Sequence, residues 1–194
     1  MTVVRPAREG DVRPVHVFVD ESIRPDGFYR LTAVTVRSVD LASLAKTIRS
    51  GVHAGSHRVH FSSEGDKRRR AILRVYANLD VGVTVIRTPH LRRVDDQPAR
   101  ERCITAMLGG PDAEIPTAVV LDTRGPDRDH LDRVLIRRLA VSRSLDRLTY
   151  VHRGSRDELL LALPDAFGWA AGPGGPWRKL IAPVATLIDV DETG

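Results

Sequence analysis

Four acidic residues stand at positions where folded proteins often build reactive sites. Asp20 and Glu21 directly follow the apolar run "VHVFV", and Asp122 follows "AVVL" in the middle of the chain. Asp165 lies in an apolar stretch near the end, "LLLALPDAFGWA". Adjacent carboxylates repel each other, so at the edge of a core they need a cation or ample water. These residues are therefore the first candidates for a metal site.

Three of the acids have the chemistry of a shared divalent-cation site. Asp20 and Asp122 each end a predicted strand, where α/β proteins build their sites, and a helix packed on the same face would bring Asp165 to them. Hard cations such as Mg²⁺ and Mn²⁺ prefer oxygen ligands. Two such ions about 4 Å apart would orient and stabilise in-line attack on a phosphodiester.

The surroundings of Asp165 strengthen this interpretation. Its neighbours four residues away on either side are Leu161 and Trp169, so a helix here would place the carboxylate on a largely apolar face. An unpaired carboxylate in such surroundings is energetically costly. A bound metal ion would remove that cost.

Capping is the alternative role for the aspartates that follow strands. Asp20 could accept backbone N–H groups from the loop "ESIRPDG", and Asp122 could do the same in "TRGPD". Glu21 would point to the opposite face of the sheet from Asp20 if the strand continues, which makes it a second-choice metal ligand. Each acid taken singly has two interpretations, and the set of three favours the metal site.

The elements that must position these acids follow from hydrophobic periodicity and turn residues. The first two strands are close enough in sequence to form an antiparallel hairpin across "RPDG". Strands are predicted at 15–20, 28–37, 81–88, 116–122 and within 146–153, and helices after Asp40 and at 63–78, 97–108, 129–144 and from about 155 to 172. This order predicts a mixed α/β (α+β) domain with a mixed sheet and helices on both faces.

Several of these motifs resemble a known family. "FVDES", "VVLD" and "ELLLALPDAFGWA" are similar to motifs of the domain of unknown function 3800 family, which is grouped with ribonuclease H-like folds. The resemblance extends from about Val15 to Ala171. It implies a single ribonuclease H-like domain over 15–194 after a leader at 1–14, with the three aspartates as candidate metal ligands.

The chain departs from that family at two positions. Ile23 stands where the family has a glycine, and Pro164 directly precedes Asp165. Proline removes a helix hydrogen bond, so we expect a kink or a new helix start at Pro164. The family often has a histidine before its central helix, which makes His60 a candidate proton shuttle or phosphate ligand; a half-buried structural role is the alternative.

Basic residues indicate a polyanionic partner. The chain carries 30 Lys and Arg against 25 Asp and Glu, a net charge of +5, and this balance favours nucleic acid. Arg124 and Arg128 follow Asp122 and could contact phosphates beside a cut site, or could pair with Asp127 and Asp129. Arg69 and Arg70, in "DKRRR", could contact nucleic acid or could belong to a solvated helix face.

Other groups of residues give weaker indications of function. His53, His57 and His60 could bind zinc, but Gly51 and Gly55 argue against one continuous helix that would align them. Cys103 is the only cysteine, which rules out an internal disulfide. We expect a cytoplasmic protein, because no apolar run is long enough to span a membrane.

The sequence therefore predicts a nuclease that hydrolyses RNA or DNA and depends on Mg²⁺ or Mn²⁺. A catalytically inactive binding module with the same fold is the alternative, because Pro164 could misplace Asp165. A phosphoacceptor domain is a third class. That chemistry needs a lysine at a later strand end, and "LTYVHR" supplies none.

Overall fold

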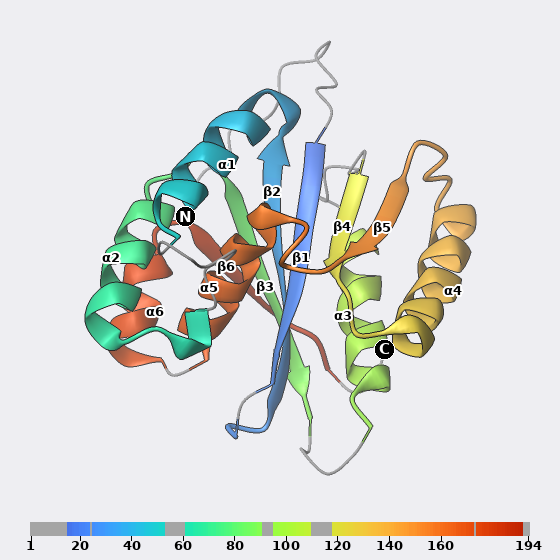
Figure 1. The fold of residues 1–194 in the computed structure, drawn as a ribbon. Helices are drawn as coiled ribbons and strands as arrows, with labels where there is room; N and C mark the ends of the chain where they lie inside the picture. The colour runs from blue at the N-terminus through green and yellow to red at the C-terminus, as the bar shows by residue number, and fades with distance from the viewer. Residues whose placement is uncertain are drawn as a thin grey trace.

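The alternating apolar residues of the predicted strands form one mixed sheet. The structure is a computed structural model that describes residues 15–23, 25–52, 61–90, 95–109, 118–172 and 174–191. Within this part of the chain the sheet has six strands in the order β5-β4-β1-β2-β3-β6 (Figure 1). The strands are β1 (Val15–Ile23), β2 (Phe28–Arg37), β3 (Gly82–Pro89), β4 (Ala118–Asp122), β5 (Thr149–Arg153) and β6 (Ala185–Asp189).

Strand direction confirms the predicted hairpin and the mixed sheet. β2 runs antiparallel to both β1 and β3. The pairs β1–β4, β4–β5 and β3–β6 are parallel. The neighbouring parallel strands β1 and β4 therefore end at the same edge of the sheet, and each ends close to one of the candidate aspartates.

Helices cover both faces of this sheet, as predicted (Figure 1). One face carries α1, α2, α5 and α6, and the other carries α3 and α4. Their bounds are α1 (Leu41–Ser50), α2 (Asp66–Tyr76), α3 (Gln97–Gly109), α4 (Pro126–Ser142), α5 (Ala162–Ala171) and α6 (Gly175–Ile181), with short 3₁₀ helices at Ser38–Asp40, Phe61–Ser63 and Leu159–Leu161.

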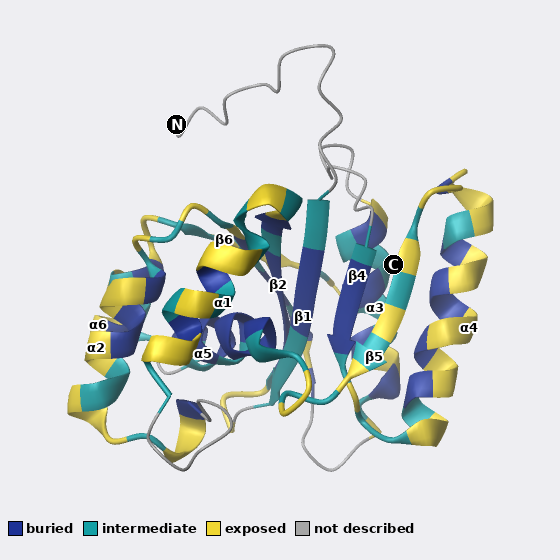
Figure 2. Cartoon of the chain, turned by 45° about the horizontal axis from the view of Figure 1, so that its top comes forward, coloured by how far each residue is buried: buried dark blue, intermediate teal, exposed yellow. Residues whose placement is uncertain are grey.

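Two apolar cores lie on the two faces of the sheet. Phe18 of β1 and Val120 of β4 belong to the core under α5, whereas Val19 and Leu121 belong to the core under α3 and α4. β1 is buried at Val17–Val19 and β4 at Val119–Leu121, and the ends of both strands are half-buried (Figure 2). Because successive side chains of a strand point to opposite faces of the sheet, the face of one core residue determines the face of the residues next to it in sequence.

The last long helix begins later than the sequence predicts. Residues 155–157 form a turn and Leu159–Leu161 a 3₁₀ helix, so α5 starts only at Ala162. Pro164 is the third residue of α5. N–H groups in the first turn have no partner within the helix, so proline is tolerated there. Pro164 thus stands at the start of a helix and does not kink a longer one.

The loop between β4 and α4 is held by a side chain of the helix. α4 begins at Pro126, three residues before the predicted start, because proline is preorganised for the first helical position. Asp129 accepts hydrogen bonds from the Thr123 hydroxyl (2.5 Å) and the Arg124 backbone N–H (2.9 Å). This loop follows Asp122 directly, so it fixes the chain beside the candidate site.

None of the helices in the described ranges combines the length and the apolar character needed to cross a bilayer. The predicted leader, residues 1–14, lies outside the described residues, as do His53, His57 and His60.

Candidate functional site

The three candidate aspartates come from elements that meet on one face of the sheet. Phe18 and Val120 pair in the parallel register of β1 and β4, as do Val19 and Leu121. Continuing this register by one residue places Asp20 beside Asp122, on strands about 4.8 Å apart. Both share the face of Phe18 and Val120, which is the face that α5 covers.

A glycine lets α5 approach this face closely. A Cβ atom added at Gly168 would lie 2.7 Å from Oγ1 of Thr32 in β2 and 3.7 Å from Cβ of Ser22 in β1. Only a residue without a side chain fits this contact. Asp165 precedes Gly168 by three residues, which is just under one helical turn. The close approach therefore brings Asp165 to the ends of β1 and β2.

The charges of Asp122 and Asp165 both act on the carboxyl group of Asp20. Burial raises the pKa of Asp20 well above its ordinary value of 3.8. Neighbouring negative charges raise this pKa further, and they are those of Glu21, Asp165 and Asp122. The hydrogen bond from the Glu21 backbone N–H lowers the pKa and is the weaker effect. Asp20 is thus a carboxylate whose surroundings disfavour its own negative charge.

Protein groups also contact two of these carboxylates. Asp20 accepts a hydrogen bond from the backbone N–H of Glu21 (2.7 Å), and Asp165 accepts one from the backbone N–H of Phe61 (3.1 Å). The contact of Asp20 agrees with the capping role that the sequence left open for it, whereas no such role was predicted for Asp165. With the side chains in these orientations, no three His, Cys, Asp or Glu residues of the described ranges are grouped closely enough to hold a metal ion.

Tyr76 is a neighbour of Asp165 that sequence reasoning missed. Burial, followed by the charge of Asp165, raises the pKa of this tyrosine. Its hydroxyl is buried and has no hydrogen-bond partner among the described residues. A neutral hydroxyl close to a carboxylate is a donor that could orient Asp165. The pattern of α2 gave no signal for this, since Tyr76 fits an ordinary core position.

Glu21 lies on the opposite face, in a second polar network. Its two carboxylate oxygens are engaged by Arg100 Nη1 (2.7 Å) and Arg124 Nε (3.2 Å). Arg100 is 1% exposed, and it also binds Asp132 through three contacts of 2.8 to 3.0 Å. The sequence makes Glu21 a second-choice metal ligand, whereas the structure gives its carboxylate two arginine partners on the face opposite the three aspartates.

The network continues through Asp132 to the edge strand. Nε2 of His152 in β5 lies 3.0 Å from Asp132, whose side chain is fully buried. Burial alone would raise the pKa of Asp132, but hydrogen bonds from His152 and Arg100 outweigh it and hold the pKa below its ordinary value. These contacts join α3, α4, β1 and β5 behind the candidate site.

Sequence reasoning missed Arg100 and Asp132, although both left a signal. Arg100 shares a helix face with Cys103 and Ile104, and Asp132 shares one with Leu135 and Ile136. A charged residue three and four positions before buried apolar residues must itself be buried and needs a partner. Arg100 and Asp132 carry opposite charges at such positions, in two helices that cover the same face of the sheet. An ion pair between them could therefore have been predicted.

The arginines that follow Asp122 pair with aspartates of another segment. Arg124 Nη2 lies 2.5 Å from Asp96, and Arg128 Nη1 lies 2.7 Å from Asp95. The side chain of Arg124 is also mostly covered. Both guanidinium groups therefore have partners within the chain, and these are not the aspartates that the sequence suggested.

Arg69 and Arg70 lie against tryptophans. Arg69 stacks 4.4 Å from the ring of Trp169, and its nitrogens bind the carbonyls of Phe61 (3.0 Å) and Ser62 (2.6 Å). Arg70 is exposed and stacks 4.7 Å from the ring of Trp177. Arg69 thus holds the segment whose backbone N–H binds Asp165, whereas Arg70 keeps an accessible charge.

No protein-family model matches the chain, and no curated protein matches it either. The resemblance to the domain of unknown function 3800 family therefore remains an expectation from short motifs.

Proposed function

We propose that the protein is a divalent-metal-dependent phosphodiester hydrolase of ribonuclease H-like fold, acting on RNA or DNA. The observation that carries this proposal is the electrostatic influence of Asp122 in β4 and Asp165 in α5 on the buried carboxyl group of Asp20 in β1. Three distant segments would have little reason to bring like charges together unless a cation binds there. The mixed sheet with helices on both faces agrees with the fold that the family resemblance implies.

The residues present fit a hard divalent cation. The site offers carboxylate oxygens and no thiol, which suits Mg²⁺ or Mn²⁺. The raised pKa of Asp20 supports the same conclusion, because a nearby cation would offset both causes of the shift. To hold a shared ion, the three short side chains would have to rotate toward it from the orientations that they adopt in the structure.

The chain's own groups have separate tasks in this proposal. Asp20, Asp122 and Asp165 would hold the cation, which when bound stabilises negative charge that develops on a phosphoryl oxygen. The Glu21 backbone N–H fixes one oxygen of Asp20, and the Phe61 N–H fixes one oxygen of Asp165. The Arg100 network holds the end of β1 from the opposite face.

Manganese binding tests the proposal without knowledge of the substrate. Isothermal titration calorimetry of the wild-type protein should detect Mn²⁺ binding, and Asp20→Asn should weaken it at least about tenfold, since a charged ligand is lost. Asp80→Asn is the matched control. Asp80 is exposed and pairs with Arg37 at the other end of the sheet, so this variant should bind Mn²⁺ like the wild type.

Hydrolysis is the second measurement. Fluorescently labelled RNA and DNA should be cut in the presence of Mn²⁺ by the wild type and by Asp80→Asn, and not by Asp20→Asn. Equal Mn²⁺ affinity of the wild type and Asp20→Asn would refute the proposal.

An inactive binding module is the second candidate. It is favoured by the separation of the acidic side chains, which form no metal-ready group among the described residues. This candidate predicts that Mn²⁺ does not bind to the wild type and that nucleic-acid binding is unchanged in Asp20→Asn. The two candidates therefore give opposite results in the same calorimetric experiment.

A further inference from the structure

The solvent face of α4 carries an open cavity of about 590 Å³. Its lining includes Val134 and Val141, which are 55% and 79% exposed. Exposed valines of this kind are costly in water, and they lie in one stripe of the helix because they are two turns apart. An apolar stripe beside a cavity indicates a surface that another molecule covers.

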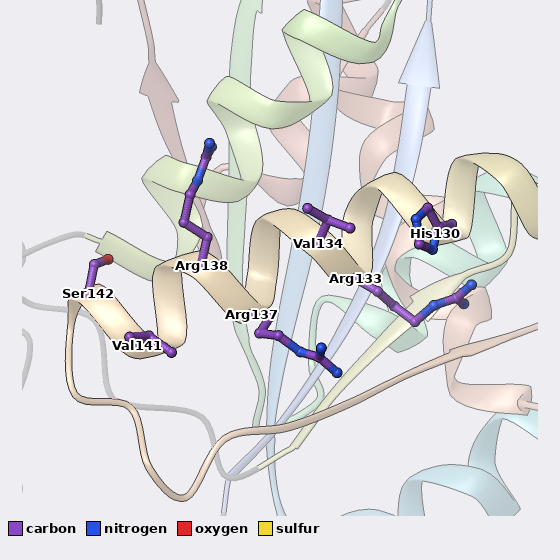
Figure 3. A pocket seen from close by; sticks show the side chains of 7 residues that line it. All are labelled: His130, Arg133, Val134, Arg137, Arg138, Val141 and Ser142. Atoms are coloured by element: carbon purple, nitrogen blue, oxygen red, sulfur yellow. The ribbon is translucent and has the colours of Figure 1, made fainter.

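Arginines flank this stripe on both sides. Arg133 and Arg137 extend from one side of α4, and Arg138 extends from the other (Figure 3). All three are exposed, and none has a side-chain hydrogen bond or ion pair with another described residue. From Arg133 to Ser142 the helix contains no acidic residue. The cavity therefore concentrates positive charge that the described part of the chain does not neutralise.

The position of α4 connects this surface to the candidate site. α4 begins four residues after Asp122, and Arg133 and Arg138 lie about 10 and 18 Å further along its axis. α4 packs on the face of the sheet opposite the aspartates, next to the edge strand β5, which pairs with β4 (Figures 1 and 2). In β5, Arg153 is exposed and pairs in register with Asp122, so positive charge continues around the edge toward the aspartates.

Charge decides which ligand fits. In a symmetric dimer the same face of a second copy would bring like-charged arginines together, which disfavours that arrangement. Arginine guanidinium groups match phosphate oxygens closely, and a strand of nucleic acid offers phosphates at regular intervals. The exposed valines suit the less polar sugar and base surfaces between those phosphates.

We infer that the α4 surface, defined by His130, Arg133, Val134, Arg137, Arg138 and Val141, binds the sugar-phosphate backbone of a nucleic acid outside the hydrolytic site. This inference takes its ligand class from the proposed function, but the binding itself requires neither the metal nor the aspartates. The surface would hold one part of a nucleic-acid strand while another part of the same nucleic acid passes around β5 to the aspartates.

Fluorescence anisotropy tests the inference under conditions where no hydrolysis occurs. The probes are fluorescein-labelled single-stranded RNA, single-stranded DNA and duplex DNA, titrated with protein in EDTA. The triple variant Arg133→Gln/Arg137→Gln/Arg138→Gln should bind at least about tenfold more weakly than the wild type. Its slope of log affinity against log salt for duplex DNA should be shallower by about 2 to 3, because about 0.9 counterions are released per phosphate contact.

A matched variant separates the surface from overall charge. Lys46→Gln/Arg49→Gln/Arg74→Gln removes three exposed positive charges from α1 and α2 instead. It should keep wild-type affinity and salt slope. Equal losses in both triple variants would mean that only net charge attracts the probe, and this would overturn the inference.

A single substitution tests the apolar stripe. Val134→Asp places a negative charge among the arginines, and it should abolish binding while the circular dichroism spectrum stays unchanged. The opposite outcome is that Val134→Asp leaves nucleic-acid binding intact and alters either self-association in sedimentation experiments or capture of an acidic protein. In that case the surface binds a protein partner and the inference is wrong. Wild-type protein that binds Mn²⁺ but none of the probes would overturn this inference and leave the proposed hydrolase standing.

Discussion

Replacing Gly168 with alanine tests the contact that brings Asp165 to the sheet. A Cβ atom at this position would lie 2.7 Å from Oγ1 of Thr32, a distance that real Cβ atoms do not adopt. Thr32 is fully buried in β2, and a β-branched side chain has little freedom to turn away. The helix must therefore move away from the sheet or the strand must distort.

The expected loss follows from two opposing effects. Alanine in place of glycine in a helix gains about 0.5 to 1 kcal/mol. Overpacking a buried contact costs about 1 to 3 kcal/mol. We expect the free energy of unfolding of Gly168→Ala to fall by about 1 to 2 kcal/mol, and Mn²⁺ binding to weaken because Asp165 moves with α5.

Urea denaturation and a double-mutant cycle make this prediction precise. Thr32→Ala removes the Oγ1 atom, which is buried without a hydrogen-bond partner among the described residues, so this change alone should cost little. Gly168→Ala should then be tolerated in the Thr32→Ala background, with an interaction energy of about 1 to 3 kcal/mol between the two sites. A Gly168→Ala protein as stable as the wild type, with no such coupling, would contradict the close approach of α5.

Three further predictions concern the charged groups and the cysteine. Without divalent metal, Asp20→Asn should raise the free energy of unfolding at pH 7. Because the folded pKa of Asp20 is raised, its ionised form destabilises the fold increasingly as the pH rises from 3.8, so the gain should vanish in urea titrations below that pH. Arg100→Met removes the guanidinium group from the fully buried carboxylate of Asp132 and should cost about 3 to 5 kcal/mol, whereas Arg128→Met breaks an exposed pair and should cost less than about 1 kcal/mol; equal midpoints in thermal melts would contradict this. Burial raises the pKa of Cys103 to about 12, so the folded protein should react with a thiol reagent only as fast as it unfolds. Rapid labelling in native buffer would show that the thiol is accessible.

Five of the described strands and most helices were predictable because their signals are local, whereas α6 and β6 lie in a C-terminal stretch for which no helix or strand was predicted. Alternation marked β1 and β2, and helical spacing marked α1 and α2. The start of the last helix was not predictable in this way. Leucines at 159–161 fit a helix pattern, but they belong to a 3₁₀ helix whose start is bound by Glu158. Apolar periodicity does not distinguish these two helix types over one turn.

The sequence by itself determined which face of the sheet each strand residue occupies, although β1 continues past the predicted end at Asp20 to Ile23. Alternation alone places Asp20 and Glu21 on opposite faces, and the partners of Glu21 agree with this. It also marked Asp165 as a carboxylate in an apolar helix. These properties depend on neighbouring residues, whose spacing the backbone geometry of strands and helices fixes.

Only the tertiary structure decided which of these residues meet. The register of β1 against β4 sets Asp20 beside Asp122, and the contact at Gly168 sets the distance of α5 from the sheet. The packing of α3 and α4 likewise brings Arg100 of α3 into contact with Glu21 of β1 and Asp132 of α4. Such pairings depend on how segments far apart in sequence pack together, and no local pattern of residues encodes that packing.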